Sequence, residues 1–86
     1  MNPHDILKYP VATEKAIRML EAENKLIFVV SKKATKDEIK QSVQQLFKAT
    51  VMTVNTTITP QGIKQAYIKL SANSPAIDIA TNLGIM

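Results

Sequence analysis

The chain has 86 residues, of which 45% are hydrophobic, and a formal net charge of +4. This length predicts one small domain over residues 1–86, and the absence of cysteine excludes disulfides and thiolate zinc sites. Because no apolar run approaches the roughly 18 residues that a membrane-spanning helix needs, we expect no membrane insertion and a cytoplasmic location.

The first third of the chain predicts a short strand, a helix and a buried strand. Pro10 disfavours helix in the residue before it, so we expect a frayed end followed by an extended piece over Ile6–Tyr9. Thr13 is positioned to cap a helix over Glu14–Ala22. The continuous apolar run Lys25–Ser31 is rich in β-branched residues, which indicates an interior strand covered on both faces.

Two further helices follow from their capping residues. The spacing Thr35-x-x-Glu38 is a capping box and predicts a helix that ends at Lys48. Near the end of the chain, Ser74 is positioned to cap a short helix that has Pro75 at its first position, a place that proline favours.

The segment Val51–Ser71 reads as a hairpin, because a proline and a glycine separate two β-rich runs. Residues of one parity share one face of a strand. Met52, Val54 and Ile58 therefore belong on an apolar face that covers the core, together with the even-numbered residues of the second run. The opposite face has hydroxyls, an amide, a phenol and an ammonium, but no carboxylate. We expect it to be the functional surface, and its residues are Thr53, Asn55, Thr57, Tyr67, Lys69 and Ser71.

The order short strand, helix, strand, helix, hairpin, helix predicts an α+β fold. We expect a small α/β sandwich with a mostly antiparallel sheet, built from a split strand-helix-strand unit and a hairpin. The second hairpin strand should lie between the other full strands, and the two longer helices should cover the apolar face.

The charge distribution favours a polyanionic partner over a catalytic role. From Ile39 to Ile77 the chain has lysines but neither Asp nor Glu, which suits a phosphate backbone; the alternative is a solvated, lysine-rich surface. Arg18 is the sole arginine, so shape and backbone recognition is expected more than the reading of bases. His4 is the only histidine, and no catalytic or metal-binding constellation can be built. We therefore expect no enzymatic activity, no cofactor and no metal.

Tyr67 has two interpretations. A single tyrosine on a strand is usually a partly buried packing residue, but an aromatic ring on an open sheet face can also stack on a base or a sugar. Its parity directs it away from the core, and the aromatic-rich consensus of the RNA-recognition motif is absent from the chain.

Four segments, taken together in their order, resemble a known family. They are Pro10-x-x-Thr13-Glu14-Lys15, the helix from Thr35 to Lys48, Val54-Asn55-Thr56, and Lys64-Gln65-Ala66-Tyr67-Ile68-Lys69-Leu70-Ser71. The family is the universal large-subunit ribosomal protein L23, and the resemblance runs from about Ile6 to Met86. The last segment, Ala76–Met86, is most similar to archaeal members.

The resemblance implies a structural protein that binds large-subunit ribosomal RNA near the exit of the polypeptide tunnel. Its implied partners are neighbouring ribosomal proteins and nascent-chain factors such as the signal recognition particle. It also implies that Glu14 lies on the factor-docking surface. The candidate residues for contact with ribosomal RNA, from the motifs and from the charged and open surfaces together, are Lys8, Tyr9, Thr13, Lys15, Asn55, Thr57, Lys64, Tyr67 and Lys69.

Two departures from the family pattern bear on these expectations. Gln65 stands where the family usually has a second cation, which removes or changes one phosphate contact. The connection between the hairpin strands is only Pro60–Ile63, whereas bacterial members have a long basic loop that reaches into the tunnel. The alternative function is a ferredoxin-like ligand-binding or protein-docking module that binds no RNA.

Overall fold

The computed structural model describes residues 3–84, and side-chain burial from Asp5 onward. Within this range the chain has an α+β fold, as the sequence predicts. In chain order its elements are α1 (Pro3–Ile6), β1 (Leu7–Pro10), α2 (Glu14–Glu23), β2 (Lys25–Val30), α3 (Lys36–Phe47), β3 (Val51–Ile58), β4 (Lys64–Leu70) and α4 (Ala76–Leu83).

The four described strands form one antiparallel sheet in the order β1-β2-β4-β3. The second hairpin strand, β4, therefore lies between β2 and β3, which confirms the expected split arrangement. In the register of the two central strands, Leu26 lies opposite Ile68 and Phe28 lies opposite Ala66. These four side chains are between 0% and 3% exposed, so the middle of the sheet is the middle of the core.

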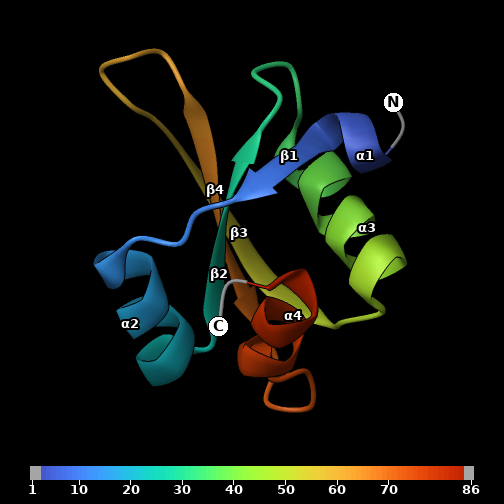
Figure 1. Cartoon of the computed structure of the whole chain (residues 1–86). Helices are drawn as coiled ribbons and strands as arrows, with labels where there is room; N and C mark the ends of the chain where they lie inside the picture. Colours follow the sequence, from blue (N-terminus) through green and yellow to red (C-terminus); the bar gives the residue numbers. More distant parts are fainter. Residues whose placement is uncertain (1–2, 85–86) are drawn as a thin grey trace.

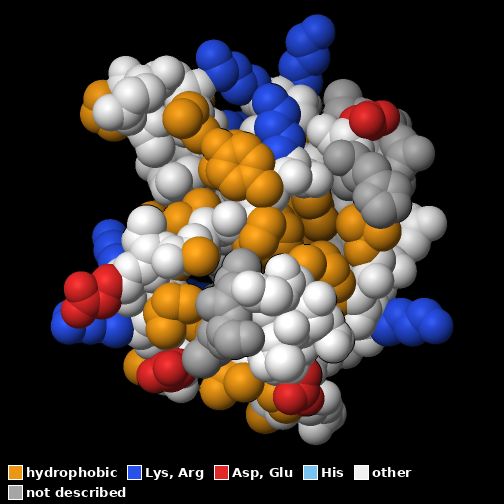
Figure 2. Space-filling model, in the orientation of Figure 1, with side chains coloured by type: hydrophobic (Ala, Val, Ile, Leu, Met, Phe, Trp, Pro, Cys, Tyr) orange, Lys and Arg blue, Asp and Glu red, His pale blue; other side chains and the backbone are white. Residues whose placement is uncertain are grey.

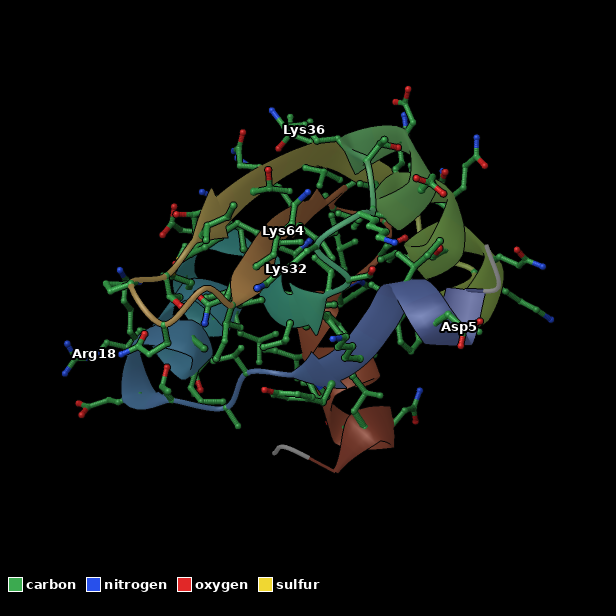
Figure 3. The ribbon with its side chains drawn as sticks, turned by 90° about the horizontal axis from the view of Figure 1, so that it is seen from above. Asp5, Arg18, Lys32, Lys36 and Lys64 are labelled. Carbon is green, nitrogen blue, oxygen red and sulfur yellow. The ribbon has the colours of Figure 1, made fainter. Side chains whose placement is uncertain are left out.

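The helices lie on both sides of this sheet. Figures 1 and 3 show α2 on one side of the strands and α3 on the other, with α1 beside α3. The expectation that both longer helices cover the same face is therefore wrong. The physical reason lies in β2, whose residues of both parities are buried. Ile27 and Val29 are only 5% and 6% exposed and lie outside the main core cluster, so the second side of β2 also needs a cover.

The capping box of α3 is confirmed. The backbone N–H of Glu38 donates to the Thr35 hydroxyl at 3.2 Å, and the backbone N–H of Thr35 donates to the Glu38 carboxylate at 3.1 Å. The apolar side of the helix packs on the core, with Ile39 and Val43 both 0% exposed and with Leu46 and Phe47 partly buried. The helix is thus fixed at its first turn and along its buried side.

The face assignment of the hairpin is confirmed in its centre and wrong at two positions. A register irregularity between Val51 and Thr53 turns Val51 into the core, where it is 4% exposed, and leaves Met52 58% exposed. Ile58 is 65% exposed, because it lies at the turn end of β3, where it pairs with Lys64. Both side chains had been expected in the core.

Two other local expectations are also wrong. Pro3–Ile6, expected as a frayed or extended end, forms a helical turn that packs against α3. Ser74 does not cap α4, because the N-cap residue is Pro75 and has no side-chain cap hydrogen bond. The Ser74 hydroxyl instead accepts a hydrogen bond from the backbone N–H of Thr50 at 2.9 Å, which joins the two loops at the base of the hairpin.

The cap of α4 comes from Asn24, far away in the sequence. Asn24 ends α2 in the left-handed conformation (φ 55°), and its Oδ1 accepts from the backbone N–H of Ala76, the first residue of α4, at 2.6 Å. Its Nδ2 donates to the carbonyl oxygens of Leu70, Ser71 and Ser74 at 3.1, 3.0 and 3.3 Å. One amide therefore joins α2, the end of β4 and the start of α4.

We predict that Asn24→Gly destabilises the protein by about 2–4 kcal/mol. Glycine keeps the left-handed backbone but removes one accepted hydrogen bond and two N–H donors that are shared among three carbonyl oxygens, which together amount to about three hydrogen bonds of about 0.5–1.5 kcal/mol each. Asn24→Ala should cost a further ~1–2 kcal/mol, because alanine is disfavoured in that conformation. Urea unfolding measures both. Asn73→Ala, at an exposed position of the neighbouring loop, is the control and should change stability by less than about 0.5 kcal/mol. Equal effects at the two positions would contradict the role of Asn24.

Candidate nucleic-acid interface

The open face is the side of β3 and β4 that is turned away from α3, defined by Thr53, Asn55, Thr57, Tyr67 and Lys69. On adjacent strands Thr53 lies opposite Lys69 and Asn55 lies opposite Tyr67. Four of these side chains are exposed, and that of Tyr67 is half-buried. The twisted sheet thus holds hydroxyl, amide, phenol and ammonium groups at fixed strand spacing on one surface.

Tyr67 points away from α3, as its parity predicts. Its neighbours on β4, Ala66 and Ile68, are 0% exposed and belong to the core cluster that includes Ile39 of α3. On the open face Tyr67 lies between Asn55 of β3 and Ile27 of β2. The ring is thus partly packed and belongs to the polar face, and its stacking on a base or a sugar stays a prediction.

α2 bounds the open face without covering it. The described contacts of α2 with the sheet are mainly with β2, so β3 and β4 are left uncovered on this side. Lys25 of β2 lies opposite Lys69, and its ammonium is 3.2 Å from the carboxylate of Glu23 at the end of α2. The cation of Lys25 is therefore partly neutralised, whereas Lys69 has no ion pair among the described residues.

A second group of candidate residues lies at the other edge of the sheet. Lys8 and Tyr9 are on β1, which β2 separates from the hairpin strand β4. Together with Lys64 they line a hollow of about 240 Å³ at the turn end of the hairpin. Figure 2 shows lysine side chains gathered at the top of the molecule, above an exposed hydrophobic patch. The predicted residues thus do not form one continuous site.

Lys64 is held by a backbone contact. Its ammonium donates to the carbonyl oxygen of Ala34 at 2.7 Å, which ties the start of β4 to the loop before α3. Its side chain is half-buried. One of the three donors of the ammonium is therefore used inside the protein, and two are left for a ligand.

The third group is at the start of α2. The Thr13 hydroxyl accepts from the backbone N–H of Ala16 at 3.2 Å, which confirms Thr13 as the N-cap. Glu14 forms an exposed ion pair with Arg18 one turn later, at 2.7 Å. Lys15 is exposed and has no ion pair among the described residues. Thr13, Glu14 and Lys15 are therefore consecutive residues whose side chains point in different directions around the start of the helix.

The sequence did not predict which other residues line the hollow beside Lys8 and Tyr9. Lys32 was expected only as one of several lysines that could add a phosphate contact, and Gln61 and Gly62 only as parts of the hairpin connection. All three line the hollow. A glycine in a turn is a common signal, and nothing in the sequence indicates that this turn packs beside the loop after β2.

The described part of the chain holds no group of three or more His, Cys, Asp or Glu side chains arranged to bind a metal ion. Among the described helices, none has the length and apolar character needed to cross a membrane.

Comparison with known proteins gives a consistent result. A family model described as ribosomal protein L23 matches residues 5–73. The chain is 48% identical over 85 residues to the protein named large ribosomal subunit protein uL23 of Methanococcus vannielii, with 99% of each chain covered. It is 47% identical over the same length and coverage to the protein of that name from Methanococcus aeolicus, and 45% identical to one from Methanococcus maripaludis.

The matched residues include the start of α2, all of α3 and both hairpin strands, which are the segments that carry the resemblance in the sequence. The relatives are archaeal, as the resemblance of the last segment predicts. The chain therefore belongs to the ribosomal protein L23 family and is of the archaeal type.

Proposed function

We propose that the chain binds large-subunit ribosomal RNA through the open face and the start of α2, near the exit of the polypeptide tunnel. In this proposal a neighbouring surface, which includes Glu14, helps form a docking site for factors that meet the nascent chain. The signal recognition particle is one such factor, and adjacent ribosomal proteins are further partners.

Membership of the family sets the coarse role. The chain is a structural, non-enzymatic component of the large ribosomal subunit, and it acts in the cytoplasm as part of the ribosome. The finer assignments concern which of its surfaces meets RNA and which meets protein, and they rest on the charge and exposure of individual side chains.

The observation that carries the RNA assignment is the open face itself. A polar sheet surface that has no carboxylate of its own, one unpaired ammonium and a partly exposed aromatic ring can approach a phosphate backbone without repulsion. Asn55 and Thr57 are exposed there beside Tyr67 and Lys69, and each offers hydrogen bonds to phosphate or ribose oxygens. The opposite face of the sheet is buried under α3 and the core, so it is not accessible to RNA.

The chemistry favours recognition of RNA shape over base sequence. Arg18 is the only arginine, and it is already paired with Glu14 at 2.7 Å. Lysine acts as a point charge and does not supply the planar fork that reads guanine edges. At the start of α2, Lys15 offers an unpaired ammonium, and the Thr13 hydroxyl can still donate its hydrogen to a phosphate while it accepts from Ala16.

The alternative is a ferredoxin-like ligand-binding or protein-docking module without RNA. The apolar side chains exposed outside the open face, Met52 and Ile58 among them, could meet a protein. The two functions differ in salt dependence, because only binding to a polyanion releases many counterions.

We predict that binding to purified large-subunit ribosomal RNA weakens steeply with salt. Lys8, Lys15, Lys64 and Lys69, with up to two of the lysines at positions 25, 32 and 33, amount to about 4–6 phosphate contacts, for a log–log slope of about −3 to −5. Affinity should fall on the order of a hundredfold between 50 and 200 mM salt. Filter binding or fluorescence anisotropy across a salt series measures this.

A matched pair of variants locates the contact. Lys69→Ala on the open face should weaken RNA binding severalfold. It should also reduce the magnitude of the log–log salt slope by about 1. Lys40→Ala removes the same charge from an exposed position of α3, on the other side of the sheet. It should change neither the affinity for RNA nor the slope of its salt dependence. A slope near zero in the wild type would favour the protein-docking alternative, and equal losses in the two variants would remove the open face from the proposal.

We also predict separate effects for the two charges at the start of α2. Glu14→Gln should slow the association of a nascent-chain factor with assembled subunits, because a rim charge acts mainly through association rate and salt dependence. Lys15→Ala should weaken RNA binding and leave docking intact.

The control for Glu14 is Asp37→Asn, which removes an exposed first-turn carboxylate from α3 on the other side of the sheet. Both changes weaken the interaction with a helix dipole, by about 0.3–1 kcal/mol. If Glu14→Gln lowers only the melting temperature, as Asp37→Asn should, the docking role of Glu14 is refuted and its helix-stabilising role remains.

A further inference from the structure

The hollow at the turn end of the hairpin, which we call the hairpin pocket, is made by three segments that are distant in the sequence. Its volume is about 240 Å³, and its walls come from β1, from the end of β2 with the loop after it, and from the hairpin turn with the first residue of β4. This is smaller than the roughly 300–1,000 Å³ of pockets that enclose drug-sized ligands. A phosphate with its sugar is a ligand of suitable size.

The pocket is lined by three lysines and by no carboxylate. Lys8, Lys32 and Lys64 contribute one cation from each segment, and the first two have no hydrogen bond or ion pair among the described residues. In Figure 3 Lys32 and Lys64 lie together in the middle of the view, while the labelled acid Asp5 lies at the far side of α1. The three cations therefore lack an internal counterion, and their shared positive potential favours an anion in the pocket.

The hairpin turn is shaped to admit the Lys32 side chain. Gly62 has φ +80°, and a Cβ added to it would lie 3.3 Å from the Lys32 ammonium nitrogen. The ammonium thus lies close over the backbone of the turn, where a side chain at position 62 would crowd it. Lys64 is positioned by the 2.7 Å hydrogen bond from its ammonium to the carbonyl oxygen of Ala34. Lys64 is thus fixed in place, while Lys8 and Lys32 are exposed and free to contact a ligand.

Tyr9 adds an aromatic surface at the rim. Its side chain is 54% exposed, although it belongs to a strand and lines the pocket beside Lys8. An exposed ring next to a cluster of cations is the combination by which proteins hold single-stranded nucleic acid, with the base on the ring and the phosphate on the cations. An inorganic anion or an acidic peptide would make no use of the ring.

We propose that the hairpin pocket binds one nucleotide unit of single-stranded RNA, with the phosphate between Lys8 and Lys32 and the base against Tyr9. This site lies at the β1 edge of the sheet, apart from the open face. The inference rests on the proposed binding of ribosomal RNA and assigns to it a second, separate contact, at which an unpaired nucleotide of that RNA is held.

The first test is an NMR titration of the full chain with a uridine hexanucleotide, uridine monophosphate, inorganic phosphate and a hexaglutamate peptide. The hexanucleotide should shift the amide signals of residues 8–9, 30–32 and 61–64 and should bind at least tenfold more tightly than the other three probes. Equal binding of the mononucleotide would assign the pocket to free nucleotides, and equal binding of phosphate or hexaglutamate would make it a general anion site. Either result overturns the proposal, as does a hexanucleotide that leaves these signals unchanged.

The second test compares Lys32→Gln with Lys36→Gln. Both remove one exposed lysine from the same stretch, but only Lys32 lines the pocket, and Figure 3 shows Lys36 at another edge of the molecule. Lys32→Gln should weaken binding to large-subunit ribosomal RNA about five- to tenfold, and Lys36→Gln less than twofold. Tyr9→Phe should retain binding that Tyr9→Leu loses. Melting curves of all four variants check that each is folded.

These measurements distinguish a failure of the pocket proposal from a failure of the proposed RNA binding on which it rests. If wild-type protein binds the RNA and Lys32→Gln is indistinguishable from Lys36→Gln, the pocket is refuted while RNA binding stands. If the wild type does not bind the RNA at all, the proposed function fails first and the pocket fails with it.

Discussion

The side-chain amide of Asn24 holds the end of α2, the end of β4 and the start of α4 in one place. It accepts from the first N–H of α4 and donates to three carbonyl oxygens of the preceding segment. A domain of 86 residues has a thin core, so a few such polar contacts fix how its helices are placed. Removing this amide would leave a helix N-terminus and several carbonyl groups without partners at once.

The position of α2 decides which surface is free. Because α2 packs mainly on β2, the hairpin strands are covered on one side only, by α3 and the core. Their other side has Tyr67 and Lys69 on a rigid, hydrogen-bonded sheet. Donors held on such a scaffold keep a constant spacing, which suits a partner recognised by its shape and its phosphates. The structural role of a ribosomal protein is consistent with a surface of this kind.

Local signals in the sequence predicted the elements well, and long-range contacts account for the errors. The capping box at Thr35 and the inward parity of Val54 depend on neighbours within a few residues, and both are correct. Met52 was misplaced because a register irregularity is decided by pairing with the partner strand. Ser74 was misassigned because the group that caps α4 comes from Asn24, 52 residues away from its partner. The same limit applies to the candidate site, whose residues were named singly but whose grouping at the hairpin pocket needs three distant segments.

The most direct test of the central claim, that the open face is the surface buried against RNA, is lysine-reactivity footprinting of assembled large subunits. Acetylation of each lysine is measured by mass spectrometry in the isolated chain, in intact subunits and after nuclease digestion. We predict that Lys69 is at least tenfold less reactive in intact subunits than in the free chain, and that digestion of the RNA restores its reactivity. Lys69 that reacts equally in intact subunits and in the isolated chain would contradict it.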